Sequence, residues 1–255
     1  MFPLAESMTR TSTDNQYKFK HITMSHFDFK KFRIYHDRCA MKVGTDGVLL
    51  GAWAEVEKSH NILDIGTGSG LIAIMLAQRT NAQIVGIDLD AQAVEQAKNN
   101  AEASPFSQQI SISCSDITQY APNCLYDNIV SNPPYFEESV LPPNTTRANA
   151  RHTEGLSLEN LVKNAKRLMG KDALFQVILP YNVCSKFISL CAVNGLSLLH
   201  RTNICTKEGK PFKRSLLRFI NNIEATTPTT DMISLSDGNR GRSEEYQKLT
   251  EDYYL

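Results

Sequence analysis

The chain has 255 residues, of which 42% are hydrophobic, and its 27 basic and 27 acidic side chains give a formal net charge of zero. This length suits one large domain with a substantial core, and no stretch approaches the roughly 18 to 20 consecutive apolar residues of a membrane helix. Residues 1–16 are polar and lack the apolar core of a secretory signal, so we predict a cytoplasmic protein.

Short apolar runs alternate with helical patterns through the middle of the chain. In chain order we predict helix 47–54, strand 61–65, helix 71–79, strand 84–88, helix 91–103, strands 110–114 and 127–131, helix 158–169 ending at Gly170, and strand 174–179. This rhythm predicts an α/β fold with a doubly wound, mostly parallel sheet.

The last third of the chain changes character. Residues 196–205 and 216–220 resemble strands and are separated by the charged turn 206–214, which predicts an antiparallel C-terminal hairpin on the sheet edge. Residues 243–255 fit either a short docking helix or a frayed tail.

A glycine-rich loop follows the first strand, in the sequence Asp64-Ile65-Gly66-Thr67-Gly68-Ser69-Gly70. Glycine permits a tight turn and a close approach of the backbone to a ligand. The spacing is G-x-G-x-G, and Leu71 stands where a dinucleotide fold has its third glycine. The loop therefore suits a sugar and an amino-acid group better than a pyrophosphate.

Acidic residues mark three successive strand ends: Asp64, Asp88 and Asp116. Asp88 is placed to accept from both hydroxyls of a ribose, and Asp116 to accept from an adenine amino group. Each aspartate alone fits a helix cap or a turn equally well. Together they predict a cofactor cleft, because open α/β sheets bind ligands at the carboxyl ends of their strands.

The motif Asn132-Pro133-Pro134-Tyr135 follows the fourth predicted strand. The Asn132 side-chain oxygen and the Pro133 carbonyl can each accept one N–H of a planar amino group, and Tyr135 offers an aromatic face for stacking. The prolines restrict Asn132 and Pro133 to extended backbone before substrate arrives. Alone, the motif is equally compatible with a turn after a strand. Beside the predicted cofactor cleft, it indicates methylation of a poorly nucleophilic amino nitrogen.

In order and spacing, the glycine loop, Asp88, Asp116 and the Asn132 motif resemble the Rossmann-like S-adenosylmethionine-dependent methyltransferases that act on amino nitrogens. Residues 36–53 and the ending 246–255 are similar to the bacterial tRNA(Val) adenine-N6-methyltransferase family, which modifies the adenosine immediately 3′ of the anticodon. The resemblance covers residues 27–255. Residues 1–26 are expected to form a loose extension.

This resemblance implies one methyltransferase domain, with a cofactor-covering segment (27–60), a cofactor-binding core (61–180) and a C-terminal sheet edge and tail (181–255). It implies that Asn132, Pro133 and Tyr135 are catalytic and that S-adenosylmethionine is the cofactor. The implied cofactor-binding residues are Lys42, Thr45, Asp46, Asp64, Gly66, Gly68, Gly70, Asp88, Asp116 and Asn132. Thr45 and Asp46 fit equally well as an N-cap before helix 47–54.

The basic residues are unevenly distributed, since residues 1–42, 142–171 and 201–218 together carry 20 basic and seven acidic side chains. We predict a tRNA partner whose phosphates contact a basic rim, although an ordinary solvated surface explains any single segment. The predicted contacts are Lys30, Lys31, Arg33, Lys207, Lys210, Lys213 and Arg214.

Neither the six cysteines nor the six histidines show metal-ligand spacing, so we expect reduced, buried thiols, no metal, no membrane partner and a monomer. A glutamine-N5 methyltransferase acting on a release factor is an alternative, although the first 60 residues lack the expected helical periodicity. A DNA adenine methyltransferase would need a target-recognition domain. A non-catalytic RNA-binding protein would have no need for both motifs.

Overall fold

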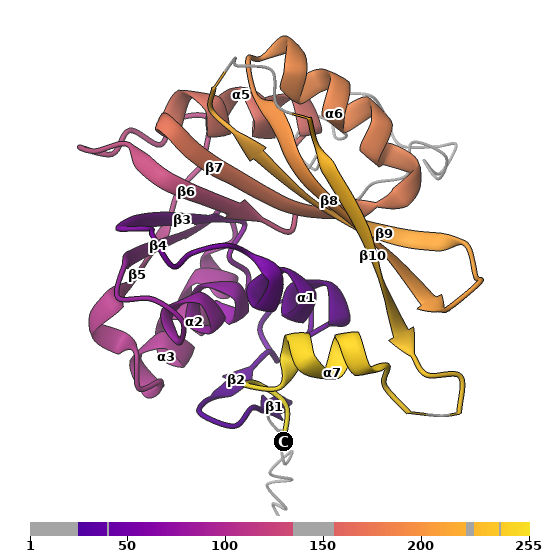
Figure 1. Cartoon of the computed structure of the whole chain (residues 1–255). Helices are drawn as coiled ribbons and strands as arrows, with labels where there is room; N and C mark the ends of the chain where they lie inside the picture. The colour runs from indigo at the N-terminus through magenta and orange to yellow at the C-terminus, as the bar shows by residue number, and fades with distance from the viewer. Residues whose placement is uncertain (1–24, 40, 135–155, 223–226, 240) are drawn as a thin grey trace, which may run out of the picture.

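The computed structural model describes residues 25–39, 41–134, 156–222, 227–239 and 241–255. Its centre is a twisted sheet with helices on both faces (Figure 1). The strands of this sheet are β3 (Asn61–Ile65), β4 (Gln83–Asp88), β5 (Ile110–Cys114), β6 (Tyr126–Ser131), β7 (Met169–Pro180), β8 (Ser197–Lys207), β9 (Phe212–Ile220) and β10 (Thr229–Ser236). They pair in the order β10-β8-β9-β7-β6-β3-β4-β5, and β9 is antiparallel to both of its neighbours. The predicted doubly wound, mostly parallel sheet with an antiparallel C-terminal hairpin is confirmed.

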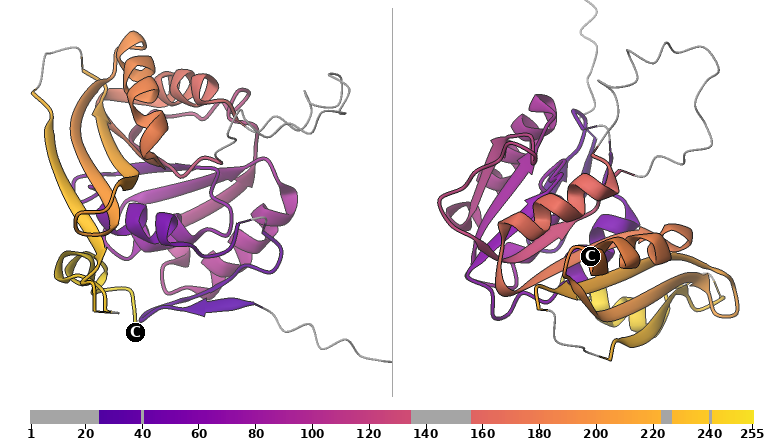
Figure 2. Two further views of the ribbon diagram at one scale, coloured as in Figure 1. Left: turned by 90° about the vertical axis from the view of Figure 1, so that its right-hand side faces the viewer. Right: turned by 90° about the horizontal axis from the view of Figure 1, so that it is seen from above.

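The helices divide between the two faces of the sheet (Figures 1 and 2). One face carries α1 (Thr45–Trp53), α2 (Leu71–Ala77) and α3 (Ala91–Ala103), and the other carries α5 (Leu158–Leu168) and α6 (Cys184–Val193). After β3 the chain adds strands in the direction of β5, and after β6 it adds them in the opposite direction, towards β7. Because both kinds of connection are right-handed, the connecting helices of the two halves lie on opposite faces of the sheet. The strand order reverses between β3 and β6, where such sheets bind ligands.

Both faces of the central strands are buried. In β3, Ile62 packs into the core shared with α1 and α2, while its neighbour Leu63 packs into the core shared with α5 and α6. Successive strand residues point to opposite faces, so a strand covered on both sides is apolar without alternation. This explains why the apolar runs of the sequence located these strands.

Two predicted features were wrong. Gly170 does not end a helix, because α5 stops at Leu168 and β7 already begins at Met169. Lys171 and Asp172 are exposed and charged, so the first part of this strand lacks the apolar run by which the later part was predicted. The predicted hairpin is also not at the edge, because β10 pairs in parallel with β8 outside it. The first four residues of β10 are exposed, so its sequence carries little hydrophobic pattern.

The two ends of the described chain meet beneath the helices. A hairpin of β1 (His26–Asp28) and β2 (Arg33–Tyr35) packs against α3 and the C-terminal tail, which follows α7 (Glu244–Thr250). The Tyr253 hydroxyl donates to the Met75 carbonyl at 3.0 Å, and the Lys30 amide donates to the Tyr253 carbonyl at 2.8 Å. The predicted docking helix is confirmed, while residues 1–24 of the predicted extension lie outside the described residues.

Two 3-10 turns, η1 (Ser107–Gln109) and η2 (Tyr181–Val183), complete the described elements. All six cysteines are free, but only Cys184, Cys191 and Cys205 are buried, so the expectation of buried thiols holds for half of them. No helix within the described ranges is long and apolar enough to cross a membrane.

Candidate active site

The carboxyl tips of the central strands are level with one another. Ile65 of β3 pairs with Ser131 of β6 on one side and with Ile87 of β4 on the other. The Ser131 hydroxyl also donates to the Ile65 carbonyl at 2.8 Å. Because paired strands lie about 4.8 Å apart, Gly66 and Asn132 leave adjacent strand tips side by side. The glycine loop and the Asn132 motif thus lie together at the switch point of the sheet, where the cofactor cleft was predicted.

The glycine loop leaves open space at two of its three glycines. Gly66 and Gly68 have φ of 73° and 55°, and a Cβ placed on either would meet no atom within 4 Å. At Gly70 a Cβ would lie 3.3 Å from that of Ala97, so this glycine is required for close packing against α3. Gly66 and Gly68 therefore leave room for a ligand to approach the backbone, and their role in binding a cofactor stays a prediction.

Asp64 lies fully buried beneath this loop. Its Oδ2 accepts from the Thr67 hydroxyl at 2.7 Å, whereas Oδ1 has no hydrogen-bond partner within the described part of the chain. Desolvation raises the pKa of Asp64 to about 7. The Thr67 hydroxyl and the Ala73 backbone amide oppose this shift, and the negative charge of Asp88 adds to it. Asp64 therefore lies as a buried acceptor under the loop, and its role towards a cofactor stays a prediction.

The other two predicted acids are fixed at the next strand tips. Asp88 accepts from the Gly68 amide at 2.8 Å and from the Asp90 amide at 3.0 Å, so its carboxylate is held beside the loop. Asp116 accepts from both the amide and the hydroxyl of Thr118 at 2.8 Å, which makes it a turn residue. Both contacts are made by Oδ1 of Asp116. The role of Asp116 towards adenine stays a prediction.

Two glycines of α1, Gly47 and Gly51, allow this helix to pack closely against α2, which follows the glycine loop. A Cβ on Gly47 would lie 3.0 Å from Leu71, and a Cβ on Gly51 would lie 2.7 Å from the Met75 sulfur. The two helices therefore run parallel in close contact, with both N-termini at the carboxyl edge. This arrangement brings residues 42–46 near the cleft, where Lys42 and Thr45 are exposed.

The N-cap of α1 is Gly44, so the interpretation of Thr45 and Asp46 as an N-cap was wrong. Both residues instead lie in the first turn of the helix. The Asp46 carboxylate accepts from Nε of Arg214 on β9 at 2.7 Å. This ion pair joins the cofactor side of the cleft to the C-terminal hairpin, and nothing in the local sequence indicated it.

Asn100 of α3 is a site residue that the sequence analysis missed. It is 1% exposed, and its Nδ2 donates at 2.8 Å both to the Ser69 carbonyl in the glycine loop and to the Tyr35 carbonyl. Its Oδ1 accepts from the Tyr35 amide. A polar residue three positions after the buried Ala97 was the available signal, because it falls on the apolar face of the helix.

The acceptor motif is described as far as Pro134. Asn132 is half-buried and Pro133 is buried, directly after the end of β6. Tyr135 and the segment 136–155 lie outside the described residues, so the stacking role of Tyr135 stays a prediction.

The structure separates the predicted basic residues into two sets. Lys207, Lys210 and Lys213 are exposed on the β8–β9 hairpin, whose tip projects at the carboxyl edge. On the β1–β2 hairpin, Lys30 donates to the Glu251 carbonyl and Arg33 pairs with Asp28. That hairpin contacts the tail that reaches Met75 and Gln78, at the end of α2 remote from the glycine loop. Only the first set lies on the hairpin that projects at the carboxyl edge.

Comparison with known proteins identifies the family of this chain. Residues 41–170 match the family model of the methyltransferase small domain. A tRNA1(Val) (adenine(37)-N6)-methyltransferase of Phocaeicola vulgatus is 47% identical over 230 residues, covering 90% of this chain and 97% of the relative. The enzyme of the same name from Photorhabdus laumondii is 45% identical over 233 residues, covering 90% and 95%. The chain belongs to this methyltransferase family.

Solved methyltransferase structures share the fold of this family member. A predicted O-methyltransferase from Agrobacterium tumefaciens superposes with a TM-score of 0.65 at 20% identity, covering 82% of this chain and 96% of the other. A putative RNA methyltransferase from Pyrococcus horikoshii reaches 0.50 at 16% identity, covering 70% and 82%. At these identities the likeness shows the fold alone.

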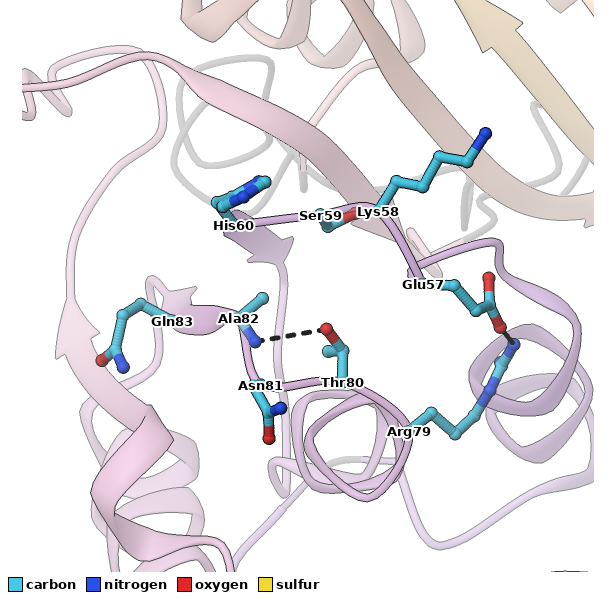
Figure 3. A pocket seen from close by; sticks show the side chains of 9 residues that line it. All are labelled: Glu57, Lys58, Ser59, His60, Arg79, Thr80, Asn81, Ala82 and Gln83. Atoms are coloured by element: carbon cyan, nitrogen blue, oxygen red, sulfur yellow. Dashed lines mark hydrogen bonds and ion pairs between the residues drawn. The ribbon is translucent and has the colours of Figure 1, made fainter.

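A shallow polar pocket of about 370 Å³ lies at the opposite edge of this methyltransferase domain, where β3 and β4 begin (Figure 3). Arg79 and Glu57 form an ion pair of 2.7 Å on its rim. None of the predicted site residues lines it. Within the described ranges, no group of three or more metal-ligating side chains is present.

Proposed function

We propose that the protein transfers the methyl group of S-adenosylmethionine to N6 of adenosine 37 in tRNA1(Val). The observation that carries this proposal is the pairing of Ile65 with Ser131, which sets the glycine loop and the Asn132 motif on neighbouring strand tips. Relatives that are 40–47% identical over nearly their whole length carry this activity in their names, which supports the choice of substrate.

The cleft fits S-adenosylmethionine, which supplies the methyl group on its sulfonium. Gly66 and Gly68 leave room for the methionine part, and the buried acceptor of Asp64 lies beneath them. Asp88, held at the tip of β4, accepts from the ribose hydroxyls. Asp116, at the tip of β5, accepts from the adenine amino group.

Asn132 and Pro133 activate the amino group of the target adenine. The N6 lone pair is delocalised into the ring, so the nitrogen is a poor nucleophile in the plane of the base. The Asn132 side-chain oxygen and the Pro133 carbonyl each accept one N–H, which draws the nitrogen towards tetrahedral geometry and stabilises its developing positive charge. Both residues precede a proline, so their backbone is held extended before the base arrives.

Placement supplies most of the remaining acceleration, and no strong general base is required. The proton leaves N6 for water after the methyl group has been transferred. A base in the anticodon loop is already unpaired, so it enters the cleft without the cost of a few kcal/mol for extrusion from a duplex.

The test uses unmodified tRNA, labelled S-adenosylmethionine and nuclease digestion to locate the labelled nucleoside. We expect N6-methyladenosine at position 37, with the rate lowered at least about 100-fold by Asn132→Ala, on the scale of losing a preorganised acceptor. The control is Asn123→Ala, which alters an exposed asparagine in the loop before β6. An undiminished rate for Asn132→Ala would refute the acceptor role.

The rival substrate is a release-factor glutamine, and the same experiment distinguishes it. Supplied with both tRNA and release factor, the protein should label only RNA; label on glutamine would overturn the RNA assignment. We further propose a cytoplasmic monomer that needs no metal. Gel filtration and methylation in the presence of a chelator test the last two statements.

A further inference from the structure

An aromatic and basic cluster lies at the carboxyl edge beside the cleft, and the proposed mechanism does not use it. Tyr181 directly follows β7 and is 39% exposed, and Phe212 begins β9. Their ring centroids are 5.3 Å apart, and the guanidinium carbon of Arg201 lies 4.7 Å from the Tyr181 centroid. We name these three side chains the Tyr181 platform.

Neutral groups hold Arg201 in place. Its Nε donates to Oδ1 of Asn203 at 2.7 Å, and its Nε and Nη2 donate to the Ser215 hydroxyl at 3.3 and 3.2 Å. Ser215 is fully buried and in turn donates to Asn203 at 2.8 Å. Arg201 forms no ion pair with an acidic side chain of the described ranges, so its charge is oriented but not neutralised within them.

The platform lies within reach of the acceptor motif. Val177 of β7 pairs with Ser131 of β6, so Asn132 is level with Ile178 and Tyr181 follows three residues later. At about 3.3 Å per residue along a strand and about 4.8 Å between strands, the two residues are separated by roughly 11 Å. A nucleotide adjacent to a base held at Asn132 spans such a distance.

The surroundings of the platform are basic. Lys207, Lys210 and Lys213 are exposed on the hairpin that leads into Phe212. Residues 201–218 carry six basic side chains and one acidic side chain, Glu208. An exposed tyrosine ring and a partly buried phenylalanine among lysines, beside an arginine with no acidic partner in the described ranges, are elements with which proteins bind unpaired nucleotides, by stacking and phosphate contacts.

We propose that the Tyr181 platform stacks an unpaired anticodon-loop nucleotide next to the target adenosine, while the hairpin lysines hold the backbone of the loop. This inference rests on the proposed function, because it takes the tRNA loop as the ligand. The exposed part of the Tyr181 ring receives the base, beside the Arg201 guanidinium that lies over the ring. The platform makes binding of the loop a two-point contact, with the target base in the cleft and its neighbour on the platform.

The test compares Tyr181→Ala with Tyr181→Phe. Stacking of one base contributes roughly 1–3 kcal/mol, so Tyr181→Ala should raise the KM for tRNA about 5- to 140-fold. Tyr181→Phe should stay within about twofold, because the ring is retained. Affinity for S-adenosylmethionine, measured by calorimetry, should not change in either variant.

A matched control is Tyr254→Ala, which removes a second arginine–tyrosine stack on the tail, where Arg242 lies 3.9 Å from the ring centroid. It should lower the melting temperature without raising the KM for tRNA. A normal KM for Tyr181→Ala would overturn the proposal. The proposal would also be overturned if Tyr181→Phe raised the KM as much as Tyr181→Ala and both variants lost affinity for the cofactor. That result would show that Tyr181 has a structural role.

Binding without catalysis separates this proposal from the proposed function. Fluorescence anisotropy with an anticodon stem-loop RNA, in the absence of S-adenosylmethionine, should show the same weakening in Tyr181→Ala. Arg201→Gln should also weaken binding, and Lys210→Ala should reduce the salt slope by about one. If the wild type binds this RNA through Tyr181 but never methylates it, the proposed function fails and the platform stands.

Discussion

Burial of Asp64 leads to a stability that depends on pH. The carboxyl group titrates at about 7 in the folded chain, raised mainly by desolvation from the ordinary 3.8. Between these values the folded protein holds a proton that the unfolded chain releases, so this group's stabilisation is complete below about pH 4 and is lost as pH rises through 7. At about 1.4 kcal/mol per tenfold change in proton affinity, the loss amounts to roughly 4 kcal/mol.

Asp64→Asn keeps the shape of the side chain and removes its charge. We expect the variant to be more stable than the wild type at pH 8.5, by up to roughly 4 kcal/mol, and the difference to shrink towards zero near pH 4. The measurement is urea unfolding of the ligand-free protein from pH 4.5 to 8.5, followed by fluorescence of the single tryptophan, Trp53. The same substitution should weaken cofactor binding at pH 8.5, where the wild-type group is charged.

The exposed Glu102 provides the control, because Glu102→Gln removes one acidic charge but leaves the buried carboxyl of Asp64 in place, so the loss of stability towards pH 8.5 should persist. The free energies of unfolding of the wild type and of Asp64→Asn are compared at each pH. A difference between them that stays constant from pH 4.5 to 8.5 would refute the reasoning. A variant less stable than the wild type at pH 8.5 would refute it equally.

Three further outcomes are expected. Gly68→Ala and Gly209→Ala, both at positive φ with open space around a Cβ, should each cost about 1 kcal/mol of stability in chemical unfolding, but only Gly68→Ala should weaken cofactor binding by calorimetry. A double-mutant cycle of Asp46→Ala and Arg214→Ala should give a coupling of about 0.5–1 kcal/mol that falls with salt, since both side chains are partly exposed; zero coupling would contradict the ion pair. Asn100→Ala should lower the free energy of unfolding by about 2–3 kcal/mol by leaving the carbonyl of Ser69 unpaired, whereas Asn99→Ala on the exposed face should not.

The sequence predicted best the elements whose pattern is local and strong. Strand 61–65, helix 91–103 and strand 110–114 have the predicted bounds, the helix because Asp90 caps it by accepting from the Gln92 amide. The β1–β2 hairpin and β10 were missed, because short or edge strands with polar residues gain their stability from neighbours distant in sequence. Their propensity alone is too weak to mark them.

The same distinction applies to the site. The glycine loop and the aspartates at the strand tips were predictable, because the end of each parallel strand fixes where the following residues lie. The pair Asp46–Arg214 joins residues 168 positions apart, and the hydrogen bonds of Asn100 to Tyr35 span 65. Such contacts follow from how helices and strands pack, which no local motif encodes.

The contact between the β1–β2 hairpin and the C-terminal tail sets an order of events during synthesis. Phe29 and Phe32 share a core with Tyr253, which lies far later in the chain. This core cannot close before Tyr253 has been synthesised, whereas the glycine loop and the central strands are made well before it. We therefore expect the central strands to pair before the β1–β2 hairpin docks.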